Sequence, residues 1–296
     1  MNSIDAKNMP FISDSSSSAS FWAAYWHKLC IGPQPHLPRL APFLSWKDVN
    51  DLLSTHMMTG EICRLVKDKR AEPPTRYIDL NTRFVKSKAI KAILRDGGTL
   101  VLNNVEAYFP YLRTMALELE RLTFAAVHIN VYAVWGSFSA FGLHRDPQDS
   151  LVVQLEGRKH WTLWKQAVPE GQDMSEVSAA NSAFDGVIEP GQWIYMPRGC
   201  WHTASGCGEP SLHATVGLTH YSLADIIAWL LEDDATCGQM TLRDISADLN
   251  HAKETVLDIV NGNLSAKTLK QFLAQRQAVR CSYPSFNLPA IDEDQT

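Results

Sequence analysis

The stretch "FGLHRDPQDSLVVQLEGRKHW" (residues 141–161) places a histidine and a carboxylate just before an apolar run, and a lysine just after a glycine. In a β-strand, residues i and i+2 project from the same face, so we expect His144 and Asp146 to point into one cavity. The apolar run is typical of a buried strand, and Gly157 predicts a turn before Lys159 opens the returning strand. An H-x-D pair arises readily by chance, so its meaning depends on a third partner.

The sequence predicts that partner in "EPGQWIYMPRGCWHTA" (residues 189–204). A Pro-Gly turn precedes the strand-like "QWIYM", and a second turn at "PRG" precedes His202. Two imidazoles and one carboxylate form the facial triad of non-haem Fe(II) oxygenases, which leaves one face of the metal open to a co-substrate and O₂. A zinc hydrolase would more typically have a closed tetrahedral ligand set with one water. The triad therefore favours iron, while the ligand types alone leave other divalent metals open.

The segments around this triad predict a mainly β fold with flanking helices. From "VHINVYAV" (127–134) to "SLHATVGLTH" (211–220), short strands alternate with Gly and Pro turns, which indicates a double-stranded β-helix of the jelly-roll or cupin type. "GGTLVLNNV" (97–105) predicts a buried strand, and "PYLRTMALELERLTF" (110–124) an amphipathic helix. Another helix is expected over "SWKDVNDLLSTH" (45–56), with Ser45 as its cap.

After Ser222 the pattern becomes helical and predicts a C-terminal appendage. We expect three parts: a disordered tail over 1–20, where "SDSSSSAS" lies, an oxygenase-like β domain over 21–221, and a helical region with a terminal tail over 222–296. In "SLADIIAWLL" the apolar residues recur at i, i+3, i+4 and i+7. This stripe predicts a homodimer, with packing on the chain's own β domain as the alternative; its residues are Leu223, Ile226, Ile227 and Leu230.

Composition restricts the classes of partner. The 296 residues are 45% hydrophobic and 20% charged, as in a globular protein, and a net charge of -5 argues against nonspecific binding to nucleic acid. The six cysteines show no C-x-x-C pair, and no apolar run approaches the roughly 18 residues of a membrane span. We therefore predict a cytoplasmic protein with neither a membrane nor a nucleic acid as its partner.

Three segments resemble the cupin-like JmjC oxygenases and, within them, the ribosomal oxygenase group. They are "NVYAVWGSFSAFGLHRDPQDSLVVQLEGRKHWTLW", "PGQWIYMPRGCWHTA" and "SLHATVG", and the likeness spans roughly residues 21–221. The resemblance implies that the two histidines and the aspartate bind Fe(II) and that 2-oxoglutarate chelates the metal. It also implies that Lys159 anchors the far carboxylate of 2-oxoglutarate, and that Asn130 and Tyr132 line the co-substrate pocket.

A physical argument for Lys159 stands beside the resemblance. A dicarboxylate in a buried pocket needs a charged partner, because an unpaired buried charge is very unfavourable. Strand alternation puts Lys159, Trp161 and Leu163 on one face, with the apolar neighbours keeping water away. The alternative is a solvated lysine. Arg145, between the two proposed ligands, must point to the opposite face, and His213 could face the cavity although packing is the commoner role of a strand histidine.

The resemblance implies a dioxygenase that hydroxylates a side chain of a protein or peptide and releases succinate and CO₂. An N-methyl demethylase of the same chemistry, a small-molecule hydroxylase and a catalytically silent cupin module remain as alternatives. The ribosomal oxygenases continue into dimerising helices and then a winged-helix module. The segment after Thr219 has room for the helices but is short for both parts, so the particular substrate stays open.

Overall fold

A computed structural model of the chain describes residues 43–164, 182–232 and 239–280. Its contacts divide the chain into two compact units, one up to Thr219 and one from His220. The expected tail over 1–20 and the terminal stretch 281–296 lie outside the described residues. The three-part division expected from the sequence stays a prediction.

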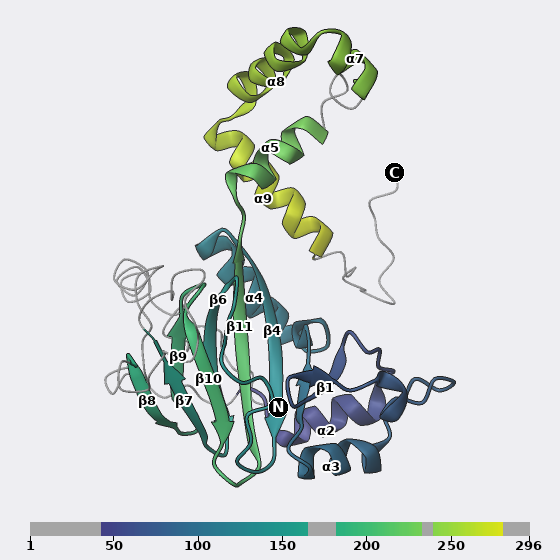
Figure 1. Ribbon diagram of the computed structural model, residues 1–296, viewed down its shortest axis with the longest axis vertical. Helices are drawn as coiled ribbons and strands as arrows, with labels where there is room; N and C mark the ends of the chain where they lie inside the picture. Colours follow the sequence, from purple (N-terminus) through teal and green to yellow (C-terminus); the bar gives the residue numbers. More distant parts are fainter. Residues whose placement is uncertain (1–42, 165–181, 233–238, 281–296) are drawn as a thin grey trace, which may run out of the picture. The chain divides into compact units, whose positions relative to one another are not determined.

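Two mostly antiparallel sheets make up the first unit (Figure 1). The larger has the strand order β2-β1-β3-β4-β11-β6-β9, and the smaller β5-β10-β7-β8. The strands are β1 Cys63–Lys67, β2 Arg70–Ala71, β3 Thr99–Leu102, β4 Ala125–Val134, β5 His144–Arg145, β6 Asp149–Glu156, β7 Lys159–Leu163, β8 Phe184–Ile188, β9 Trp193–Met196, β10 Trp201–Gly206 and β11 Ser211–His220. The predicted double-stranded β-helix is confirmed.

Strand β6 shows why the sequence around the first histidine is so apolar. Leu151, Val153 and Leu155 belong to the main core, which the large sheet shares with the helices that cover it. Val152 points the other way and packs with Trp161 of β7 in a second core between the sheets. Because both faces of β6 are covered, alternation in direction produces no alternation in hydrophobicity.

Within the described part of the first unit, three helices and two short 3₁₀ turns accompany the large sheet. Their bounds are α2 Trp46–Thr55, η2 Pro74–Arg76, α3 Ser87–Arg95, η3 Val105–Ala107 and α4 Pro110–Thr123. Ser45 caps α2 in a capping box with Asp48, as the sequence predicts. Helix α4 packs against β4 through the buried residues Leu112, Met115, Ala116 and Leu119, which recur at helical spacing.

The connection from β6 to β7 depends on a glycine. Gly157 has a φ of +62°, in the left-handed region. A Cβ at this position would lie 2.1 Å from the carbonyl oxygen of Pro210. Only glycine satisfies both conditions, so the sequence requires glycine at this turn, after which Lys159 opens β7 beside β10.

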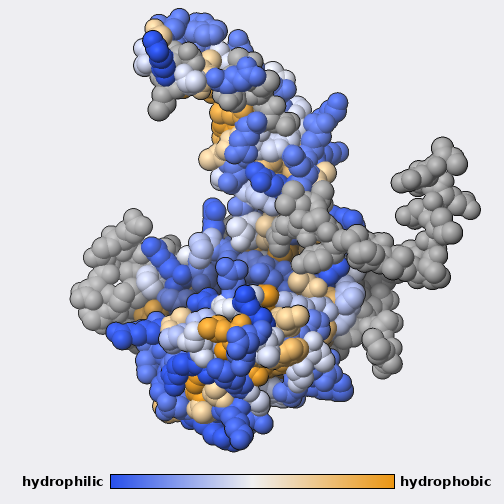
Figure 2. Space-filling model, turned by 90° about the vertical axis from the view of Figure 1, so that its right-hand side faces the viewer, coloured by the Kyte–Doolittle hydropathy of each residue, from blue (hydrophilic) through white to orange (hydrophobic). Residues whose placement is uncertain are grey.

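The second unit is helical, as expected, and its described residues form α5 Leu223–Glu232, α7 Leu242–Ala247, α8 Leu249–Asn263 and α9 Ala266–Arg280. Its small core centres on Phe272, whose ring meets Tyr221 and Trp229 edge-on at 5.1 and 5.5 Å. Several leucines of this unit stay exposed: Leu223, Leu249, Leu257, Leu264 and Leu269. Figure 2 shows hydrophobic colour at the surface of this unit. None of the described helices combines the length and the apolar character needed to cross a bilayer.

Candidate metal centre and its cavity

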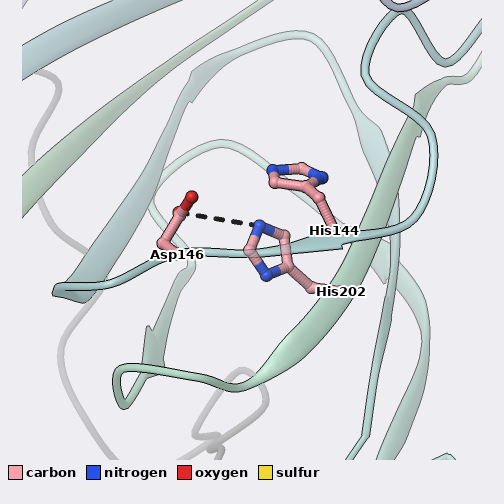
Figure 3. A group of neighbouring side chains, drawn as sticks. All are labelled: His144, Asp146 and His202. Atoms are coloured by element: carbon pink, nitrogen blue, oxygen red, sulfur yellow. Dashed lines mark ion pairs between the residues drawn. The ribbon is translucent and has the colours of Figure 1, made fainter. Parts of the chain in front are cut away.

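The structure brings together the three side chains that the sequence singled out. His144 lies in β5, Asp146 follows this strand directly, and His202 lies in β10, paired with His144 across the small sheet. Each offers one ligand atom, and these atoms all lie within 4.8 Å of one another. Figure 3 shows the side chains converging, with His202 Nε2 3.8 Å from Asp146 Oδ2. This is a spacing at which one metal ion can contact all three.

The strand that carries the first two residues is shorter than expected. β5 ends at Arg145, so Asp146 lies just outside it, yet its carboxylate still turns toward the histidines. Arg145 is exposed and its guanidinium lies 5.4 Å from the ring centre of Trp201. It therefore points away from the triad, as alternation predicts.

Backbone carbonyls orient both imidazoles. The Nδ1 atom of His144 lies 3.1 Å from the oxygen of Gly142, and that of His202 lies 3.0 Å from the oxygen of Cys200. A carbonyl oxygen only accepts, so Nδ1 carries the proton in each neutral ring and Nε2 presents its lone pair. This is the arrangement that metal-binding histidines use.

Burial also favours the neutral form of the His202 imidazole, which is the form that binds a cation. The side chain is only 4% exposed. Burial lowers the pKa of His202, and the neighbouring His144, at a ring distance of 4.2 Å, lowers it further. The imidazole is therefore neutral around pH 7, as a metal ligand must be. The donor set thus fits a divalent metal ion.

A cavity of about 190 Å³ leads from the triad into the space between the two sheets. Both sheets contribute to its wall, which contains apolar as well as polar side chains. The lining residues besides the triad are Thr99, Tyr132, Phe138, Ala140, Phe141, Gln148, Val152, Lys159, Trp161, Met196, Ala204, His213 and Thr215.

Lys159 lies in this wall and is only 6% exposed. Burial lowers its pKa to about 7. Its Nζ lies 3.3 Å from Nδ1 of His213, and no ion pair joins it to a carboxylate among the described residues. A buried ammonium in such a setting is stabilised by an anionic ligand, so the cavity suits a carboxylate at this end.

Tyr132 and Asn130 differ in their relation to the cavity. Tyr132 lines it and stacks on His213 with the ring centres 4.8 Å apart. Burial raises the pKa of Tyr132 to about 12, against the effect of a hydrogen bond with the Asn130 side chain. Asn130 is not among the lining residues; its Oδ1 accepts a hydrogen bond from the backbone N–H of Asn104.

His213 is the residue whose place in the site the sequence left open. It is buried beside Lys159, and both burial and the lysine charge lower its pKa. The available signal was the alternation of "SLHATVG" in β11, where Leu212, Ala214 and Val216 enter the main core. Residues of opposite parity, His213 and Thr215, therefore face the cavity.

A family model and several known proteins are similar to this chain, and they agree on the kind of domain. Residues 109–226 match the JmjC domain. The chain is 33% identical over 144 residues to the "Bifunctional lysine-specific demethylase and histidyl-hydroxylase NO66" of Drosophila mojavensis, covering 45% of this chain. It is 25% identical over 301 residues to "Ribosomal oxygenase 2" of Rattus norvegicus, covering 88% of this chain. The chain spans 16% of the length of the fly relative and 63% of the rat relative.

Solved structures with a similar fold support the fold assignment of this chain. YcfD of Escherichia coli, named as a ribosomal oxygenase, superposes with a TM-score of 0.58 at 14% identity, over 88% of this chain and 69% of YcfD. YcfD has also been solved with cobalt and 2-oxoglutarate, with a TM-score of 0.58 at 13% identity, over 87% of this chain and 70% of that one. The JmjC match and the named relatives confirm the resemblance seen in the sequence, and the solved structures agree in fold.

Proposed function

We propose, from the premise that residues 109–226 form a JmjC domain, that the chain is an Fe(II)- and 2-oxoglutarate-dependent oxygenase that hydroxylates a side chain of a protein or peptide. One observation carries the proposal: three metal-ligand atoms within 4.8 Å of one another open onto a cavity that contains a buried lysine. A cation site and an anion site in one cavity suit a metal ion and a dicarboxylate bound together.

In this proposal, His144, Asp146 and His202 hold the iron. Their preset tautomers and the lowered pKa of His202 favour this role. Three ligands on one face leave three coordination positions for other groups. When bound, iron with 2-oxoglutarate and O₂ supplies the oxidative decarboxylation to succinate and CO₂ and the transfer of one oxygen atom to a C–H bond.

The chain's other residues bind the co-substrate and exclude water. Lys159 neutralises the far carboxylate of 2-oxoglutarate, a task for which its buried ammonium has no competing ion pair among the described side chains. Tyr132 and His213 form the adjacent wall, and Asn130 orients the Tyr132 hydroxyl through their hydrogen bond. Trp161, packed in the core between the sheets, keeps this end dry.

A polypeptide substrate is supported by the relatives and by the cavity mouth. The similar proteins are named as a histidyl-hydroxylase with lysine demethylase activity and as ribosomal oxygenases. Arg145 and Arg198 are exposed beside Asp146 in an open hollow, where an extended chain could make polar contacts. The relatives' demethylase name also favours N-methyl demethylation as a second activity, since a hydroxylated N-methyl group breaks down to formaldehyde.

The experiment combines the purified chain with Fe(II), 2-oxoglutarate, O₂ and candidate polypeptides, including ribosomal proteins and methylated histone peptides. Mass spectrometry should find a polypeptide that gains about 16 Da, one oxygen atom, with succinate formed in step. A gain in formaldehyde with loss of a methyl group would identify the demethylase instead. His202→Ala is the control and should be inactive in both assays. Coupled turnover of a small metabolite, with none of any polypeptide, would contradict the proposal.

A homodimer formed through the helices after Ser222 also belongs to this proposal. Leu223, at the start of the predicted stripe, is 59% exposed, as a contact between copies requires, whereas Leu230 at its end is buried within the unit. Light scattering at micromolar concentration should give the mass of a dimer, and a monomer would contradict it. The cytoplasmic location stays a prediction.

A further inference from the structure

A buried carboxylate lies next to the candidate metal centre without belonging to it. Asp149 opens β6, three residues after Asp146, and is 0% exposed. Its Oδ2 accepts a hydrogen bond from the hydroxyl of Tyr195 at 2.7 Å. Its Oδ1 accepts one from the backbone N–H of Arg198 at 2.8 Å. Burial of a carboxylate is unfavourable without such donors, so its presence calls for a reason.

The hydrogen bond from Arg198 to Asp149 involves the turn that precedes His202. Pro197–Cys200 form this turn, with the N–H of Cys200 bonded to the oxygen of Pro197 at 3.0 Å. Gly199 has a φ of +77°, as the third position of a type II turn requires. The N–H of Gly199 is bonded to the carbonyl oxygen of Asp146 at 2.8 Å. The backbone N–H groups of Arg198 and Gly199 are therefore both bonded to the segment that carries Asp146.

The hydrogen bonds from Arg198 to Asp149 and from Gly199 to Asp146, which we call the clamp, connect the segments that carry two of the candidate metal ligands. The backbone carbonyl oxygen of Asp146 accepts the hydrogen bond from Gly199, and the carboxylate of Asp149 accepts the one from Arg198. His202 follows the turn within β10. The two hydrogen bonds thus connect the segments that carry the Asp146 carboxylate and the His202 ring, whose nearest ligand atoms are 3.8 Å apart.

We propose that Asp149 is a positioning residue whose buried carboxylate sets the separation of Asp146 and His202 for metal binding. The inference rests on the proposed metal-dependent function. An apolar side chain of similar size would fill the space, but it would leave the Arg198 amide and the Tyr195 hydroxyl without their acceptor. The turn could then relax, and the cation would meet ligands at the wrong spacing. Residues that orient metal ligands in this way typically change metal affinity when mutated.

The test measures Co(II) binding to the full chain by calorimetry, together with the visible absorption spectrum of the bound cobalt. Asp149→Asn keeps the shape but removes the charge, and we expect Co(II) affinity to fall by roughly 10- to 100-fold with an altered spectrum. Tyr195→Phe removes the hydroxyl donor and keeps the carboxylate with its bond from Arg198, so it should give a smaller loss. It also keeps the proposal testable if Asp149→Asn does not fold.

Glu120→Gln is the matched control. Glu120 of α4 is another buried carboxylate, 5% exposed, and accepts a hydrogen bond from the backbone N–H of Val127 at 3.0 Å, outside the cavity wall. Its variant should lower the melting temperature but leave Co(II) affinity and the spectrum unchanged.

Three outcomes would overturn the inference. Unchanged Co(II) affinity and spectrum in both Asp149→Asn and Tyr195→Phe would show that the clamp does not set ligand spacing. An equal loss of affinity in Glu120→Gln would show a general effect of destabilisation. If the unmodified chain binds no Co(II) at all, the proposed function fails first, and this result differs from the other two because no variant is needed to see it.

Discussion

Raising the pH above about 7 should weaken the binding of 2-oxoglutarate, because the cavity holds Lys159 at a pKa of about 7. Burial lowers this pKa from 10.5, since the ammonium loses its hydration and gains no carboxylate partner among the described residues. A bound carboxylate favours the ammonium and raises the pKa again. Above pH 7 each binding event must therefore take up a proton that free Lys159 has released.

The size of the effect follows from that linkage. While the pKa in the complex stays above the working pH, affinity falls by about tenfold for each pH unit above about 7, since one pKa unit corresponds to 1.36 kcal/mol. Between about pH 7 and pH 9 the loss should approach about 100-fold. Below pH 7 the lysine is already protonated, and its contribution no longer changes.

Calorimetry under anaerobic conditions, with Mn(II) saturating and 2-oxoglutarate as titrant, measures this directly. Repeating the titration at about pH 8 in buffers of different ionisation enthalpy counts the protons taken up, and we expect close to one per ligand. Lys159→Arg is the control, because a guanidinium stays charged throughout this range and should remove the pH dependence. Equal affinity at about pH 7 and pH 9, with no proton uptake, would refute the assigned role of Lys159.

Three further results are expected. His202→Ala should abolish tight Mn(II) binding with little loss of thermal stability, whereas His213→Ala should retain it; equal retention in both would contradict the triad. As the pH rises from about 7 toward 10.5, the ligand-free protein should gain free energy of unfolding relative to Lys159→Met. In this range the lysine of the unfolded chain keeps a proton that the buried lysine of the folded chain has lost. Denaturant titrations at the lower and the upper pH measure the difference. Gly157→Ala should cost at least about 1–3 kcal/mol of unfolding free energy. Gly199→Ala, at a similar φ but with nothing within 4 Å of the new Cβ, should cost less; the reverse order would show that the contact with Pro210 is not limiting.

Local signals were sufficient to predict the fold and the members of the triad. Turn residues such as Gly157 and Gly199 adopt the left-handed backbone that their sequence context suggests, and they lie at the turns that precede β7 and β10. The capping box at Ser45 and the apolar stripe of α4 likewise depend on residues within one or two helical turns. These features need no knowledge of which strands become neighbours.

The remaining features of the site depend on contacts between distant segments. The 3.3 Å approach of Lys159 to His213 joins strands of two different sheets, and no local pattern states that β7 and β11 face each other. The same holds for Asp149, whose partners Tyr195 and Arg198 lie in and beyond β9. The local sequence around Asp149, a carboxylate at the start of an apolar run, does not indicate these contacts. Its two acceptor roles become visible once the pairing of β6 with β9 is known.

The charge state of the cavity connects the proposed metal site with the proposed co-substrate site. Burial lowers the pKa of His202, His213 and Lys159 alike, so all three bases tend to release their protons. Among the described lining residues, Asp146 is then the one carboxylate, and a cation is the ligand it favours. A divalent cation at the triad would in turn raise the local positive potential and attract a dicarboxylate toward Lys159, which regains its proton as the anion arrives. The geometry therefore favours an order in which the metal ion binds first and strengthens the binding of the co-substrate.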